Sequence, residues 1–175
     1  PADQLPEQSP EAEEQLGRVE VCKLEHNKQT AILYSNPLGR ACYQLDVAKV
    51  EFCLAELKRG GLLEAGLVYA SSVRPLTKES RHLSSKEFRR FANENGCQPM
   101  ILACAACATE LGRIRQELGI HDDRSKTDRE REVQLRAEEV IKALVNSGAR
   151  LSTADVGPNG NTALHVAART GAPKL

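Results

Sequence analysis

The sequence predicts an all-α fold built from pairs of antiparallel helices. Only 3% of the 175 residues are aromatic and none is Trp. Ala and Leu are abundant, a composition that favours packing between helices over sheets of β-branched and aromatic residues. Apolar residues also recur with helical spacing, as at Val47, Val50, Leu54 and Leu57. Short polar or Gly-containing stretches separate such segments, as is typical of helix hairpins.

The N-terminal part is expected to contain a leader and one capping helix. Residues 1–8 are acidic, contain two prolines and lack apolar periodicity, so we expect a disordered leader. A Ser-Pro pair then offers a helix start. Over about 10–26, Leu16, Val19 and Cys22 share one helical face, although the valines of this segment also alternate as in a strand. The helix is the preferred interpretation.

The next segment, about 34–61, has the pattern of two helices joined by a turn. Asn36 precedes Pro37, which places a capping side chain before a proline at the first helical position. Asp46 then precedes the apolar stripe that begins at Val47, and two consecutive glycines end it. The segment therefore predicts a helix-turn-helix unit.

A weaker pattern follows over about 70–96, where Gly, Ser and Pro interrupt the chain. Residues 73–76 offer a degenerate helix start. Ser84 and Glu87 form a capping box for a second short helix. We interpret this segment as a degenerate helix pair.

The longest helical pattern lies within about 96–155. Pro99 opens an apolar run whose periodicity continues to Leu118, and a second helix begins near Thr127 and ends at a Ser-Gly pair at 147–148. The polar connection between them is short, which predicts an antiparallel hairpin.

Near the C-terminus, residues 160–171 read Gly-Asn-Thr-Ala-Leu-His-Val-Ala-Ala-Arg-Thr-Gly. This motif resembles the opening helix of an ankyrin repeat, with Ala163 in place of the family's proline. Residues 139–149 resemble the second helix of a preceding repeat with its glycine stop. An incomplete repeat would then occupy about 158–175.

The resemblance implies a short ankyrin-type α-solenoid over residues 9–175, in which Pro37 and Pro99 mark earlier repeat openings. The 70–96 repeat would be degenerate, and the 96–155 repeat would carry an inserted helical extension. Such a solenoid implies a non-catalytic scaffold that binds a protein or peptide through its loop tips and concave face. The candidate partner-binding residues are polar residues at those positions: Asn93, Asn95, Asp155, Asn159, Asn161 and Arg169.

The last repeat is unfinished at Leu175, and a solenoid needs a terminal cap. We therefore expect either that the chain is the N-terminal part of a longer protein or that a missing repeat or second chain covers the last helix. An alternative function is a substrate-recruiting or regulatory domain of a larger enzyme.

The cysteines raise a second alternative, a metal or redox sensor. Cys104 and Cys107 have the C-x-x-C spacing, and Cys97 and His121 are conceivable further ligands. However, the pair lies in an Ala-rich helical pattern and no second C-x-x-C completes a ligand set, so packing as small hydrophobes is preferred. His165 is expected to fix the repeat's loop by hydrogen bonding. No catalytic residue, metal or cofactor is expected.

Charge and hydropathy limit the partners. The 24 basic and 24 acidic side chains cancel, which argues against nucleic acid and membrane surfaces. No apolar run is long enough to span a bilayer, so we expect a cytoplasmic or nuclear protein. The mixed charges of 122–132 are typical of a solvated face. Alternatively this part of the hairpin binds the partner, in which case deleting 120–131 should abolish binding and leave helicity intact.

Overall fold

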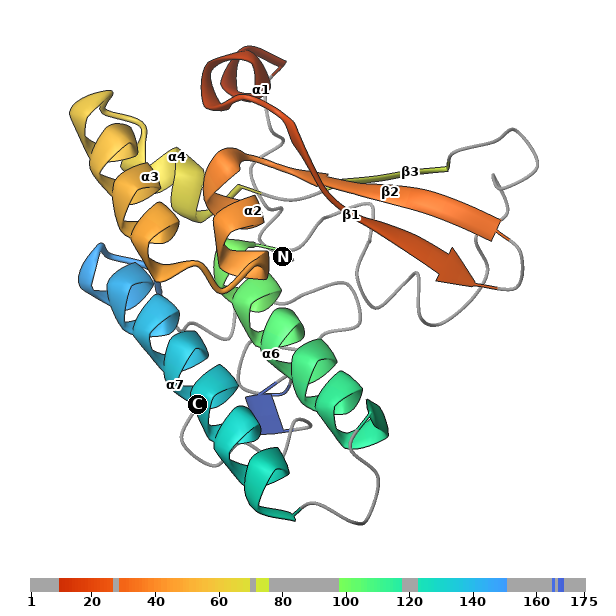
Figure 1. Ribbon diagram of the computed structural model, residues 1–175. Coiled ribbons are helices and arrows are strands. Elements are labelled where there is room, and N and C mark those ends of the chain that lie inside the picture. The colour runs from red at the N-terminus through yellow and green to blue at the C-terminus, as the bar shows by residue number, and fades with distance from the viewer. Residues whose placement is uncertain are drawn as a thin grey trace.

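The computed structural model describes residues 10–26, 29–69, 72–75, 98–117, 123–150, 165 and 167–168. Within these ranges the chain forms six helices and one three-stranded antiparallel sheet (Figure 1). The expected all-α fold is therefore wrong, and the described elements do not form the expected ankyrin-type solenoid. The reason lies mainly in the N-terminal third, where strands replace the capping helix.

The N-terminal helix is much shorter than predicted. It begins at Pro10 as expected, but α1 covers only Pro10–Leu16 and ends at Gly17, whose φ of +74° few other residues adopt readily. The chain continues as β1 (Val19–His26), which pairs antiparallel with β2 (Gln29–Ser35). The helix predicted over 10–26 is thus wrong beyond the first turns, because the alternating valines belong to a strand.

The third strand corrects another prediction. Residues 73–76 were expected to start a helix, but Ser72–Pro75 is strand β3, which pairs antiparallel with β2 and places Val73 opposite Leu33. The sheet order is therefore β1-β2-β3. The capping-box helix predicted further along the 70–96 segment lies outside the described residues.

The helix-turn-helix unit after β2 is confirmed as two helices, α2 (Pro37–Tyr43) and α3 (Val47–Arg59). The Asn36 side chain caps α2 by accepting a 2.7 Å hydrogen bond from the Gly39 N–H. Asp46 caps α3 in the same way, at 3.1 Å from the Lys49 nitrogen. The short helix α4 follows at Leu63–Leu67.

The long hairpin is also confirmed as two helices, α6 (Pro99–Glu117) and α7 (Asp123–Asn146). The second helix begins earlier than the predicted Thr127 and ends where the Ser-Gly pair predicted. Two ion pairs join the helices near their connection, Arg115 with Glu130 at 2.8 Å and Arg129 with Glu117 at 3.6 Å. Both pairs are partly exposed, so each stabilises the hairpin only modestly.

The core is centred on α6. This helix packs against α2 and α7, while α3 packs against α7, so the α2–α3 and α6–α7 pairs lie side by side (Figure 1). Leu111, Ile114 and Val133 are buried in the main core, so this part of the long hairpin is not a protruding insertion. A smaller cluster joins the sheet to α6; it consists of Leu33, Ile101, Leu102 and Cys104.

Of the segment that resembles an ankyrin repeat, the described residues are His165, Ala167 and Ala168. All three are helical; Ala167 is buried and His165 is exposed. The rest of the 158–175 repeat lies outside the described residues. Among the helices that the structure describes, none has the length and apolar character needed to cross a membrane.

Candidate functional site

The partner-binding residues predicted from the sequence all lie outside the described ranges, and the structure therefore places none of them. These residues are Asn93, Asn95, Asp155, Asn159, Asn161 and Arg169. Among the described residues, the remaining candidates are the thiols, the titratable groups and the hollows that these residues form.

The C-x-x-C pair lies inside the protein. Cys104 and Cys107 are 2% and 0% exposed, on the α6 faces that contact the sheet cluster and the main core. Burial raises the pKa of Cys104 to about 12 and that of Cys107 to about 11, which disfavours the thiolates that bind metals or react with oxidants. Within the described ranges no three His, Cys, Asp or Glu side chains gather as a metal site.

The resolved pKa shifts do not favour acid-base chemistry near neutral pH. Burial raises the pKa of Cys42 and Tyr43 above their ordinary values. The Lys49 backbone N–H lowers the pKa of Asp46, and the Glu138 carboxylate raises the pKa of Lys142. Since a general acid or base works best with a pKa near the working pH, these shifts point away from such a role.

Two hollows are lined by residues that the structure describes, and the more apolar of these two is a groove of about 300 Å³ between α1, the start of α2 and one side of α3. We call it the α1–α3 groove. It is lined by Gln15, Leu16, Asn36, Pro37, Leu38, Phe52, Cys53, Glu56, Leu57 and Leu62. Most of its lining is apolar, which suits an inserted apolar side chain.

Phe52 gives this groove an exposed aromatic edge. Its side chain is 65% exposed, the largest value among the exposed large hydrophobic residues of the described ranges. Ala48 and Ala55, one helical turn before and after it, are exposed as well. An exposed aromatic ring beside an apolar hollow is a feature that protein-binding surfaces share.

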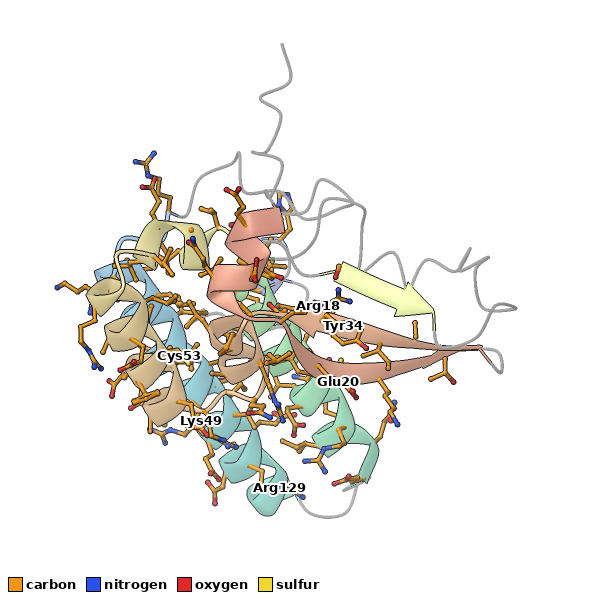
Figure 2. All side chains as sticks on the ribbon, turned by 90° about the horizontal axis from the view of Figure 1, so that it is seen from above. Arg18, Glu20, Tyr34, Lys49, Cys53 and Arg129 are labelled. Atoms are coloured by element: carbon orange, nitrogen blue, oxygen red, sulfur yellow. The ribbon has the colours of Figure 1, made fainter. Side chains whose placement is uncertain are left out.

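The residues around Phe52 on α3 carry paired charges. Lys49 Nζ lies 3.0 Å from Asp46 Oδ2 near the start of the helix, and Arg59 pairs with Glu56 near its end. The Lys49 and Glu56 side chains are 65% and 45% exposed, so both can meet a partner. Lys49 and the groove residue Cys53 mark this helix in Figure 2.

A second hollow of about 420 Å³ lies where α4 meets the start of α6 and the turn after α7. Leu67 and Met100 contribute apolar surface, and Glu64 and Arg150 contribute opposite charges. Its lining is less apolar than that of the α1–α3 groove, and it lacks an exposed aromatic side chain. The α1–α3 groove is therefore the stronger candidate site for an apolar contact.

The sequence contained a signal for this site that composition and motif matching did not use. The apolar stripe of α3 consists of Val47, Val50, Leu54 and Leu57, and Phe52 lies off that stripe. An aromatic residue on the polar side of an amphipathic helix indicates a contact other than the core. The groove beside it could not be foreseen, because its other walls come from α1 and the start of α2, whose positions beside α3 depend on tertiary packing.

Comparison with known proteins finds no matching family model, no matching curated protein and no matching solved structure.

Proposed function

We propose that this chain is a non-catalytic protein-binding module and that the partner docks on α3 at the α1–α3 groove. The observation that carries the proposal is Phe52, which is 65% exposed beside an apolar hollow of about 300 Å³. Exposed aromatic residues next to such hollows contribute much of the binding energy in protein interfaces.

The charges of the chain also support a protein partner. The net charge is zero and exposed acidic and basic residues are mixed along α3, which offers no extended field of one sign for nucleic acid. The lining of the groove is mostly apolar, and the Asn36 amide within it already bonds to Gly39 and Gly66. Insertion of an apolar side chain from a protein or peptide fits these features best.

A display selection tests the proposal. Peptides selected on the immobilised wild-type chain should carry an apolar anchor residue. Phe52→Ala should weaken their binding at least about tenfold, because the aromatic edge is lost. Leu135→Ala provides a matched control, since Leu135 on α7 is 50% exposed and lies outside the groove lining. Titration calorimetry with the wild type and both variants measures the difference.

Two outcomes would contradict the proposal. One is that the selection enriches no peptide. The other is that selected peptides bind the Phe52→Ala variant as tightly as the wild type. Circular dichroism of both variants checks that the fold is retained, which we expect because each side chain is exposed.

A further inference from the structure

The α3 surface is complementary to itself, which points to a specific occupant. It carries both a projecting aromatic side chain, Phe52, and the hollow beside it. In a two-fold symmetric contact the same patch serves on both copies, so a projection on one copy meets the hollow of the other. A surface with both features satisfies this requirement without a second kind of partner.

The charges on α3 follow the same symmetry. On the face of α3 that carries Phe52 they occur in the order Asp46, Lys49, Glu56, Arg59, with an acid-base pair at each end. The helix has two further exposed charges, Glu51 and Lys58, which lie on the opposite side of the helical turn from Lys49 and Glu56. Consider two antiparallel copies of α3 with the two-fold axis between Phe52 and Cys53. Lys49 precedes the axis by as many residues as Glu56 follows it, so Lys49 of one copy lies opposite Glu56 of the other.

The outer charges match under the same axis. Asp46 precedes the axis by as many residues as Arg59 follows it, so these opposite charges also face each other across the contact. Each pairing occurs twice by symmetry. The residues next to the axis also fit this arrangement. Phe52 of one copy lies opposite Cys53 of the other, and Cys53 lines the groove.

We propose that the α1–α3 groove binds a second copy of this chain, through an antiparallel α3–α3 contact in which each Phe52 enters the other copy's groove. The inference rests on the proposed function, since it names the partner of the same site. The zero net charge of the chain permits the approach of two copies.

The expected contact is small. The 13 residues of α3 span about 20 Å, which limits the buried area to the low end of specific interfaces. We therefore expect a dissociation constant in the micromolar range. Sedimentation of the full chain from about 1 to 500 µM should then show a monomer–dimer equilibrium.

Charge reversal tests the register directly. Lys49→Glu alone places a carboxylate opposite Glu56 of the other copy, and the symmetry repeats this repulsion on the other side of the axis. Glu56→Lys alone places an ammonium group opposite Lys49 of the other copy and creates the corresponding repulsion. Each single variant should weaken dimerisation about tenfold. The double variant exchanges the charges and restores both attractions, so its dissociation constant should return to within about threefold of the wild-type value. Lys142→Glu on α7 is the control and should dimerise as the wild type does.

The outcomes separate this inference from the proposed function. Rescue by the double variant, together with weaker dimerisation of Phe52→Ala, supports the α3–α3 contact. A chain that stays monomeric at the highest concentration overturns it, and so does a double variant no better than the singles. A monomeric chain whose selected peptides still depend on Phe52 overturns the dimer alone and leaves the proposed function standing.

Discussion

At the scale of single residues, Asn36 links two parts of the fold through one side chain. Its Oδ1 accepts the Gly39 N–H at the start of α2, and its Nδ2 donates to the Gly66 carbonyl of α4 at 3.2 Å. The side chain is 1% exposed, so neither bond can be replaced by bulk water. Asn36 also contributes to the lining of the α1–α3 groove.

Replacing this residue should separate its two roles. Asn36→Ala should lower the free energy of unfolding by about 2 to 4 kcal/mol, because the cap is lost and the Gly66 carbonyl becomes unsatisfied. Asn36→Ser retains a capping oxygen but does not reach Gly66, so it should cost about half as much. Urea denaturation measures both values. Equal losses would contradict the separate contribution of the bond to Gly66.

The buried thiol of Cys104 predicts a loss of stability at alkaline pH. Burial raises its pKa from 9.0 to about 12, so the folded state keeps its proton where the unfolded state loses it. The protonated Cys104 thiol therefore adds to the free energy of unfolding. This contribution is fully present below pH 9 and is lost as the pH rises through the pKa of the folded state. The slope between these values is about 1.4 kcal/mol per pH unit. Denaturation from about pH 8 to 10.5 should show a shallower decline for Cys104→Ala; an unchanged slope would refute this.

At the scale of elements, Gly39 allows β2, α2 and α6 to meet closely. A Cβ at this position would overlap the Ser35 hydroxyl at the end of β2 and lie 3.2 Å from Leu102 Cδ1 on α6. A second helical glycine, Gly112 on α6, has open space around it, with no atom within 4 Å of its Cβ position. The two glycines therefore have different structural roles.

The same substitution at these glycines should have opposite effects. Gly39→Ala should destabilise the protein by about 1 to 3 kcal/mol through overpacking between the strand and the helices. Gly112→Ala should stabilise it by up to about 1 kcal/mol, because alanine loses less conformational freedom in a helix. Thermal unfolding of both variants measures the difference. Stabilisation by Gly39→Ala would show that the close approach is not required.

The helices were more predictable than the strands for a physical reason. Three helix starts could be identified without tertiary information, because each is marked by a residue that affects only its neighbours in sequence. These residues are the caps Asn36 and Asp46 and the proline at position 99. Strand β1 depends on pairing with β2, and β2 depends on β1 and β3. The alternating valines of β1 and the Thr-Ala-Ile-Leu-Tyr run of β2 indicate strands, but Leu16, Val19 and Cys22 also have helical spacing, and only the pairing with β2 decides between the two.

At the scale of the whole molecule, the two helix pairs bury one continuous core and leave the outer face of α3 exposed. The stripe containing Val50 and Leu54 contacts that core, while Phe52 lies on the opposite side with Lys49 and Glu56. The proposed dimer would cover this exposed face without altering the core. Dimerisation should therefore add its own free energy to the free energy of unfolding of the monomer.

Stability should consequently depend on protein concentration. If folded chains pair through α3, mass action stabilises them, and the Tm should rise by about 1 to 3 °C for each tenfold increase in concentration above the dissociation constant. Phe52→Ala should have a Tm that does not change with concentration, whereas Leu135→Ala should behave as the wild type. Calorimetry over a hundredfold range makes the comparison, and a concentration-independent wild-type Tm would contradict the pairing.

The sequence alone determined the positions of α2, α3, α6 and most of α7, because capping groups and apolar periodicity act within each helix. It did not determine the fold class, since the sheet forms from β1, β2 and β3 only when distant backbone groups pair. It also did not identify the α1–α3 groove, whose walls come from three separate segments. The Ala-rich helical pattern already favoured the burial of Cys104 and Cys107, but only the tertiary structure could place Phe52 outward beside a hollow, because burial depends on what packs against each helix face.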